Sequence, residues 1–390
     1  MRWGRIALPL ALSAASLLPL TTGCGDGGEQ RVRITAAISL LPTELPAYRE
    51  IAEAAAHDHG FEVEVRMLQY EDIRRALEAE VAGGRGTLDV VEADVFDLAA
   101  IARSVRALPE PATLTFLNSF AVEAGVIDGE RRFLPHRLAW QALIVNTEAV
   151  PFPPATWEDL LRVAEEHSGA IGLKADAYEG LTCDLLPFLW QAGGDPLHPE
   201  NPANAAALRF LQRLAPHLNP AAQGYREGSI LQAQELGEIV LHQNWPFAVP
   251  QLREAGLLPG RMCTAPLPAG PAGQATLLGG GYLAVSRVAN HPDEAALFVE
   301  AMTRAEVQRQ LVERLGWFPV REDGWDSMSE ADRADFAGFI AMAEYVRPRP
   351  VREDYPDISA LWQEAFERAV LRGEDAETTL ADIASRMPTD

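Results

Sequence analysis

Residues 61–67 read FEVEVRM, with apolar side chains at every second position and Glu62, Glu64 and Arg66 between them. Successive side chains of a strand point to opposite faces of a sheet. The alternation therefore predicts a strand with one buried face and one exposed face. The segments on either side of this strand determine the fold class.

These flanking segments alternate between strand and helix. Upstream, residues 32–39 have the composition of a buried strand, and residues 45–56 have apolar side chains at helical spacing. Downstream, residues 73–81 fit one face of a helix, and residues 88–91 fit another buried strand. The order strand, helix, strand, helix, strand predicts an α/β fold with a mainly parallel sheet that helices flank.

Helix signals continue through the rest of the chain. Each consists of a capping residue, a proline at a helix start or a glycine at a helix end. They are Thr156 with Asp159, Asn201 with Pro202, Thr303 with Glu306 before a helix ending near Gly316, and two helices at 358–372 and 376–386 separated by Gly373.

Composition excludes several functions. The chain has 390 residues, a length that suits two domains, and 56 acidic residues against 33 basic ones give a net charge of -23. So acidic a surface repels phosphate, which argues against nucleic-acid partners and against binding to anionic lipid. The spacing of the three cysteines suggests neither a disulfide framework nor a zinc site. We expect Cys183 and Cys263 to be free thiols, with a disulfide between them after export as the alternative. We expect no cofactor and no metal.

The N-terminus has the pattern of an export signal. Arg2 and Arg5 precede an apolar run at residues 6–20, which is too short to span a membrane. Small residues then lead to Cys24 and a glycine-rich, acidic stretch. This resembles a bacterial lipoprotein signal, which implies that Cys24 carries the lipid anchor. A plain signal peptide with an incidental cysteine is the alternative, and both interpretations export the protein.

A set of short stretches lies in a characteristic order along the chain. They are LDVVEADVF at 88–96, PPATWEDL at 153–160, YEGL at 178–181, NWPFA at 244–248 and RPRP at 347–350. Together they resemble the extracellular solute-binding proteins of bacterial ABC transporters, in the carbohydrate-binding, maltose- and trehalose-type group. The resemblance covers nearly the whole chain after Cys24.

The resemblance implies two α/β lobes joined by crossing strands, with a ligand cleft between the lobes that closes by a hinge motion. It also implies a division of the chain. The parts are a signal peptide at 1–23, a lipid-anchored tether at 24–31, an N-lobe at 32–138 and 281–322, and a C-lobe at 139–280 and 323–390. We expect the run of glycines at 279–281 to add backbone freedom at the return crossing.

A saccharide site needs polar groups for the hydroxyls and a flat aromatic ring for the C–H face. Asp94 ends a predicted strand, where α/β sheets place ligand residues, although a helix cap would also suit it. The resemblance implies that Asp94, Tyr178, Glu179 and Gly180 contact the ligand and that Trp245 stacks on it.

Four further residues complete the predicted ligand-binding set. The crossing strand has Ala139 where the family often has Asp, and the return crossing has Gly281 where it often has Trp. Trp140 and Tyr282 are therefore candidates to compensate. Gly280 lies at the return crossing, and Arg321 is similar to a cation at the cleft edge. With these departures the sequence still predicts a carbohydrate ligand, but it does not identify the sugar.

The sequence predicts a substrate-binding lipoprotein of an ABC sugar importer. It would be a monomeric non-enzyme outside the cytoplasmic membrane that captures a mono- or oligosaccharide and delivers it to the permease. The lipid anchor would be its only membrane contact. Two alternatives stay open: a secreted glycoside-processing enzyme, or the same fold with a polyol, a glycerol-phosphate-type solute or a metal as ligand.

Overall fold

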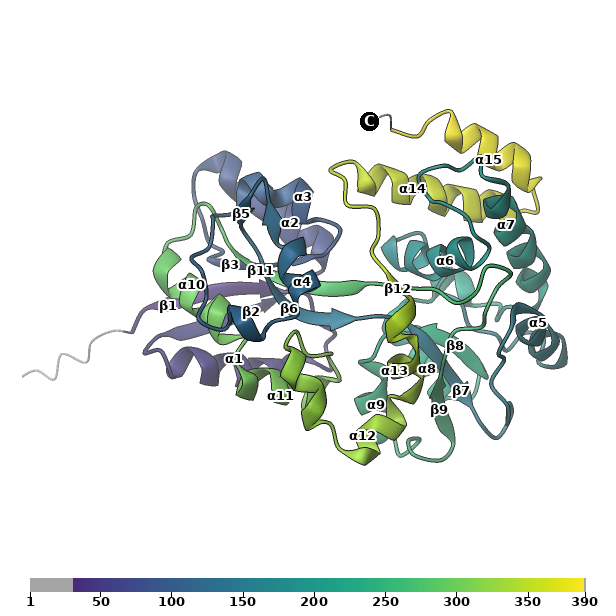
Figure 1. Ribbon diagram of the computed structural model, residues 1–390, viewed down its shortest axis with the longest axis horizontal. Helices are drawn as coiled ribbons and strands as arrows, with labels where there is room; N and C mark the ends of the chain where they lie inside the picture. Colours follow the sequence, from purple (N-terminus) through teal and green to yellow (C-terminus); the bar gives the residue numbers. More distant parts are fainter. Residues whose placement is uncertain (1–30, 389–390) are drawn as a thin grey trace, which may run out of the picture. The chain divides into compact units, whose positions relative to one another are not determined.

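Two β-sheets organise the chain from Val32 onward, which forms one compact unit (Figure 1). The computed structural model describes residues 31–388. The predicted signal peptide and Cys24 lie outside these residues. Each sheet, with the helices that cover it, forms one lobe, so the predicted two-lobe α/β architecture is confirmed.

The first lobe contains a five-stranded sheet in the order β2-β1-β3-β11-β6. The strands are β1 (Arg33–Ile38), β2 (Glu62–Met67), β3 (Val90–Asp94), β6 (Leu134–Ala139) and β11 (Gly279–Val285). Helices α1 (Leu45–His57) and α2 (Tyr70–Gly83) connect the first three strands, as the sequence predicts. β1 runs parallel to both β2 and β3 because each connecting helix returns the chain to the same end of the sheet.

The expectation of mainly parallel sheets is wrong beyond these three strands. β11 is antiparallel to β3 and to β6, because β6 carries the chain out to the second lobe and β11 brings it back (Figure 1). The second sheet has the order β8-β7-β9 and is antiparallel throughout. Its strands are β7 (Ala142–Asn146), β8 (Leu241–Asn244) and β9 (Met262–Ala265).

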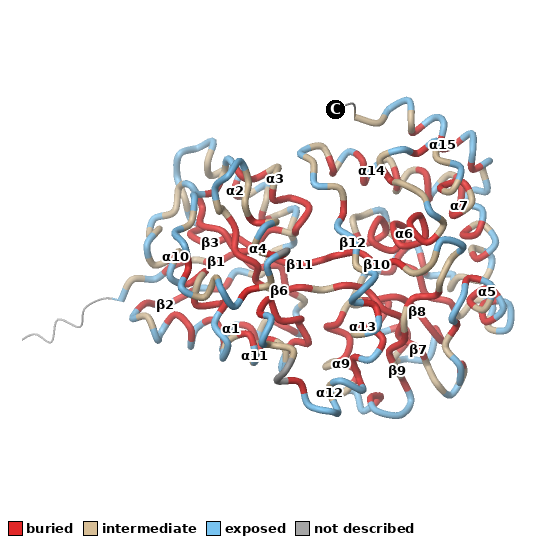
Figure 2. Tube along the Cα trace, viewed as in Figure 1, coloured by how far each residue is buried: buried red, intermediate tan, exposed pale blue. Residues whose placement is uncertain are grey.

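Helices cover the second sheet. They are α5 (Trp157–Glu166), α6 (Glu179–Gln191), α7 (Pro202–Leu214), α8 (Glu227–Glu235) and α9 (Ala248–Glu254). The Thr156 side chain and Asp159 form the predicted capping box at α5, and the Asn201 side chain caps α7. Almost every residue of α6 is buried, so this helix is the core of the second lobe (Figure 2).

The chain's single lysine, Lys174, lies inside this core. Its side chain is 0% exposed, and Nζ lies 2.7 Å from Asp184 Oδ1 on α6. Nζ also donates a hydrogen bond to the Gln243 carbonyl at 3.2 Å. The buried charge is therefore fully paired, and it ties α6 to β8.

One predicted helix cap is wrong. α10 (Pro292–Ala301) is followed by α11 (Ala305–Leu315), whose first-turn amides receive no side-chain cap. The Thr303 hydroxyl donates instead to the Glu300 carbonyl at 2.7 Å, so it serves the end of α10. The predicted end of α11 is confirmed, because Gly316 has the left-handed backbone that a helix end favours.

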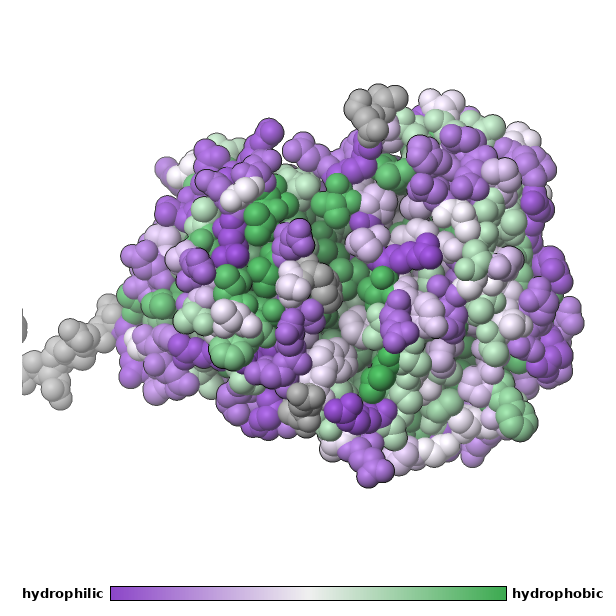
Figure 3. Space-filling model, viewed as in Figure 1, coloured by the Kyte–Doolittle hydropathy of each residue, from purple (hydrophilic) through white to green (hydrophobic). Residues whose placement is uncertain are grey.

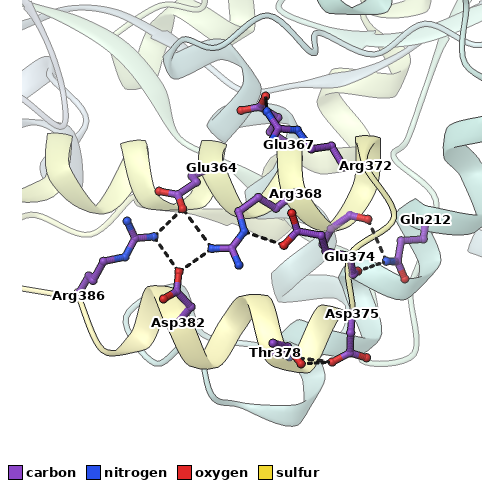
Figure 4. Close-up of polar contacts among 11 residues, drawn as sticks. Gln212, Glu364, Glu367, Arg368, Arg372, Glu374, Asp375, Thr378, Asp382 and Arg386 are labelled. Carbon is purple, nitrogen blue, oxygen red and sulfur yellow. Dashed lines mark hydrogen bonds and ion pairs between the residues drawn. The ribbon is translucent and has the colours of Figure 1, made fainter.

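The C-terminal segment packs on the second lobe. It contains α12 (Glu330–Asp335), α13 (Ala337–Met342), β12 (Val346–Arg347), α14 (Tyr355–Ala365), a π-helical turn (Phe366–Leu371) and α15 (Ala376–Ala384). Arg368 in the π turn pairs with Glu364, Glu374 and Asp382, and Arg386 pairs with Glu364 (Figure 4). These ion pairs hold α15 against α14.

The remaining short α-helices and strands are α3 (Leu98–Ile101), α4 (Ser119–Ala124), β4 (Val126–Ile127), β5 (Glu130–Arg131) and β10 (Thr276–Leu277). Strand β10 pairs with β12. None of the helices in residues 31–388 is long and apolar enough to cross a membrane. On the face shown in Figure 3, hydrophilic residues predominate toward the edges and hydrophobic ones gather nearer the middle.

Candidate functional site

A cavity of about 550 Å³ is lined by residues of both lobes. Asp94, Gly280 and neighbouring residues line it from the first lobe and the crossing strands. The second lobe contributes α6 and its N-terminal approach, together with the loop after β8. Six of the nine residues predicted to bind a ligand line this cavity: Asp94, Tyr178, Glu179, Gly180, Trp245 and Gly280.

Trp245 enters the cavity from the loop that follows β8. The Asn244 side chain accepts a hydrogen bond from the Trp245 amide at 2.9 Å, which shapes this loop. The indole packs against the backbone of Gly279, where an added Cβ would lie 2.7 Å from Cζ3 of the ring. Among the described residues, no other aromatic ring and no guanidinium stacks on it. The indole is therefore held in place while part of its surface stays available to a ligand.

The glycines at the return crossing allow close packing. All three lie in strand β11 and pair with β6, Gly281 also pairs with β3, and the register with β6 shifts between Gly281 and Tyr282. A Cβ on Gly280 would lie 2.6 Å from the Arg137 carbonyl oxygen, and one on Gly281 would overlap the Glu92 carboxylate. Close packing therefore accounts for glycine at these positions, and backbone freedom at this crossing stays a prediction.

Glu92 is the centre of a buried polar network under the cavity floor. Its carboxylate accepts hydrogen bonds from the Ser39 amide at 2.9 Å and from His136 Nδ1 at 2.9 Å, and it lies 3.1 Å from Arg137 Nε. Burial raises the pKa of Glu92, but Arg137 and His136 outweigh burial and hold this pKa below its usual value. Glu92 is thus a fixed anion that orients Arg137.

Arg137 lines the cavity, and its ion pair with Glu92 holds the guanidinium in position. Its guanidinium lies over the ring of Trp317, with 4.1 Å between Cζ and the ring centroid. Trp317 Nε1 in turn donates to Glu44 Oε1 at 2.8 Å. Sequence reasoning missed Arg137, Trp317 and Glu44. Nothing in the local pattern distinguishes them from core or surface residues.

Arg349 joins the two carboxylates that the sequence singles out. Its guanidinium, 1% exposed, pairs with Asp94 at the end of β3, and Nη1 lies 2.9 Å from Glu179 Oε1 at the start of α6. It also lies over the ring of Phe96, 4.5 Å from the centroid. The RPRP stretch was a sequence signal for Arg349, but it carried no assigned role. The pairing links residues of the two lobes.

The charge states of the cavity acids follow from this packing. Burial raises the pKa of Asp94 to about 6, although Arg349 opposes the shift. Burial likewise raises the pKa of Asp97 to about 7, against the pull of Arg74. Two acids of the first lobe therefore titrate near neutral pH.

Tyr178 and Gly180 form one packed unit at the start of α6. A Cβ on Gly180 would overlap the Tyr178 ring, so the glycine makes room for this ring. The Arg226 guanidinium lies 4.5 Å from the centroid of the ring. Burial, and then the nearby Glu227 carboxylate, raise the pKa of the Tyr178 hydroxyl. Arg226 therefore covers one face of the ring, and the hydroxyl stays protonated.

Three predicted ligand residues do not line the cavity. Trp140 is buried, donates from Nε1 to the Phe339 carbonyl at 2.7 Å and lines a separate cavity. Tyr282 is buried and donates to the Ala121 carbonyl at 3.0 Å. Arg321 is buried and forms a two-pronged ion pair with Asp323. Trp140 and Tyr282 therefore do not replace the missing Asp and Trp.

The described residues contain no group of three or more His, Cys, Asp or Glu side chains arranged to hold a metal ion. Cys183 and Cys263 are free thiols. Cys183 lies beside the cavity, and burial raises its pKa well above the usual value. The cavity therefore offers carboxylates, hydroxyls, guanidiniums and an indole surface, which are groups for binding by hydrogen bonds and stacking.

Comparisons with known proteins agree with this architecture. The chain is 32% identical over 187 residues to a probable ABC transporter-binding protein of Deinococcus radiodurans, a match that spans 43% of this chain and 44% of that protein. It is 25% identical over 361 residues to the maltotriose-binding protein of Pyrococcus abyssi, covering 87% of this chain and 76% of that one.

Among solved structures, the maltose-bound MalE3 protein of T. maritima shares the fold, with a TM-score of 0.82 and 23% identity. That match covers 91% of this chain and 99% of the other. At this identity the likeness concerns the fold alone. The family model for bacterial extracellular solute-binding proteins matches residues 50–333, nearly three quarters of the sequence. The chain belongs to the family of bacterial extracellular solute-binding proteins.

Proposed function

We propose that this chain is the solute-binding component of an ABC sugar importer. It captures a mono- or oligosaccharide in the cavity between its lobes and delivers it, chemically unchanged, to a membrane permease. The observation that supports this most is the pairing of a partly free indole, Trp245, with the fixed carboxylates Asp94 and Glu179 around one cavity. Relatives named for maltose and maltotriose binding point to the same solute class.

Capture is coupled to a hinge motion in this proposal. Asp94 belongs to the first lobe, whereas Glu179 and Trp245 belong to the second. A saccharide that touches all three gains its full set of contacts only when the lobes are closed. It therefore binds the closed state more tightly, which is the condition for shifting the population toward that state. The proposed lobe boundaries lie at residues 138–139, 280–281 and 322–323.

The setting of the receptor follows from its family and from the N-terminal pattern. We place it outside the cytoplasmic membrane as a monomer, held there by a lipid on Cys24, with residues 24–31 as the tether. The family is one of extracellular solute-binding proteins, which supports export. The ABC transporter-binding relative supports the permease as a partner.

Catalysis is not part of the proposal. Asp94 and Glu179, the two cavity acids that the proposal assigns to the ligand, are both tied to the Arg349 guanidinium. A general acid or base for glycoside cleavage has to be free to transfer its proton. Neither carboxylate has that freedom here.

A saccharide screen tests the function. Thermal unfolding should be followed with glucose, maltose, trehalose and maltotriose, with ribitol and glycerol as polyol controls. A sugar present at 100 times its Kd should stabilise the fold by about 2.7 kcal/mol, and product analysis should find it unchanged. Cleavage of the sugar would favour an enzyme, and stabilisation by polyols alone would overturn the saccharide assignment.

A further inference from the structure

The charged side chains that line the cavity are mostly acidic. Among the described lining residues, three are arginine and six are aspartate or glutamate. The arginines are Arg74, Arg137 and Arg226, and no lining residue is lysine. An anionic solute would need at least one of these three guanidiniums to be available for binding.

Each lining arginine already has a carboxylate partner. Arg74 lies 3.2 Å from Asp97, and Arg226 lies 2.5 Å from Asp176. Arg137 is paired with the buried Glu92, as described above. Arg349, just behind the lining, is shared by Asp94 and Glu179. Each of these guanidiniums therefore faces at least one carboxylate of the protein.

An anionic solute would compete with these carboxylates for the guanidiniums. Drawing Arg137 away from the buried Glu92 would leave that carboxylate without compensation, which is costly, whereas the half-exposed Arg226–Asp176 pair resists less. The phosphate or carboxylate of the solute would also face the excess of negative charge in the cavity and the net charge of -23 on the chain.

Three of the six lining carboxylates form no ion pair among the described residues. Glu44 accepts hydrogen bonds from Trp317 Nε1 and from the Leu41 amide, which leaves Glu71 on α2 and Glu227 on α8. Glu71 and Glu227 each lie in the first turn of their helix, where the helix dipole favours a negative charge. They are on different lobes, so the cavity has an unpaired anion on each of its two sides.

From these contacts we infer that the cavity selects saccharides by charge. It takes a neutral or amine-bearing saccharide and rejects uronates, sugar phosphates and glycerol phosphate. This inference rests on the proposed function and narrows its substrate class. It also removes the glycerol-phosphate-type solute from the ligands that the fold alone allows.

Matched sugars test the inference. Glucose and maltose should each be compared with the 6-amino-6-deoxy derivative and with the corresponding uronate, and glycerol with glycerol 3-phosphate, by calorimetry at constant ionic strength. At least one neutral or amino sugar should bind, and its uronate should bind at least tenfold more weakly. A uronate that equals its parent overturns the charge rule but keeps the saccharide function. Absence of binding by every sugar overturns the function and the rule together.

A variant separates this rule from a general charge effect. Glu227→Gln removes one free carboxylate, so it should weaken binding of the amino sugar relative to its neutral parent by about two- to fivefold at low salt. Glu158→Gln, an exposed acid in the first turn of α5, is the matched control and should leave the ratio unchanged. Equal effects of the two variants would overturn the assignment to the cavity.

Discussion

Asp94 and Arg349 form an ion pair that joins the end of β3 to the segment before α14, 255 residues apart in sequence. The same guanidinium holds Glu179 at the start of α6. Two carboxylates proposed to bind the solute, one from each lobe, therefore share one buried cation. Sugar hydroxyls that reach them meet acceptors whose positions are already set.

Arg349→Met should destabilise the protein strongly. Methionine keeps most of the side-chain volume but leaves two part-buried carboxylates without their cation, which typically costs about 3–5 kcal/mol. Urea unfolding measures the loss. Arg347→Met, at an exposed arginine two residues away, is the control and should change stability little. Similar losses in both variants would contradict the proposed pairing.

The raised pKa of Asp97 predicts a specific pH dependence. Its pKa is about 7 in the folded protein against an ordinary value of 3.8, so folding takes up a proton between these values. Its contribution to stability is therefore full below pH 4 and is lost as pH rises through 7. Asp97→Asn should flatten the curve of unfolding free energy against pH between 4 and 7, whereas Asp58→Asn, at an exposed acid, should not. A curve unchanged by Asp97→Asn would count against the shift.

Trp245→Ala should weaken saccharide binding by about 1–3 kcal/mol, because it removes the stacking surface. Calorimetry on the sugar found by the screen measures the change. Trp190→Ala is the comparison, since Trp190 is buried on α6 and its loss should lower stability instead. Unchanged affinity with lost stability in Trp245→Ala would identify Trp245 as a core residue.

Gly279→Ala should impair binding through Trp245. The added methyl group would lie 2.7 Å from the indole, so the ring has to move. We expect a shifted tryptophan emission spectrum and weaker sugar binding. Gly83→Ala is the matched control because nothing lies within 4 Å of its Cβ position and its φ is ordinary. Normal affinity in Gly279→Ala would show that the contact does not position the ring.

Cys24→Ser should release the protein from the membrane fraction of the cells that export it, because it removes the thiol to which the proposed lipid is attached. Mass spectrometry of the mature wild type should show the lipid. Cys263→Ser changes a thiol away from the N-terminus and should stay with the membrane. A Cys24→Ser protein that remains membrane-bound would point to another anchor.

The sequence predicts the local elements well and the long-range partners poorly. The alternation at residues 61–67 and the capping box at Thr156 are local signals, and both are confirmed. Antiparallel pairing of β11 with β3 depends on residues far apart in sequence, so no local period reveals it.

The same limit applies to the cavity. Asp94 and Trp245 could be found from their positions beside strands and loops, together with the family resemblance. Arg137 could not, because its role comes from Glu92 and Trp317, which lie 45 residues before it and 180 residues after it. Tyr282 and Trp140 look like ligand residues in sequence, yet their polar atoms donate hydrogen bonds to backbone carbonyls of the core.

The burial of Lys174 has a practical consequence for handling this protein. Amine-directed reagents, such as succinimidyl esters and aldehyde crosslinkers, find no accessible lysine on the folded described chain. Modification of Lys174 would require local opening of the second lobe. The rate of its labelling would thus measure that opening, while coupling the folded protein to a surface would have to use other groups, such as its many carboxylates.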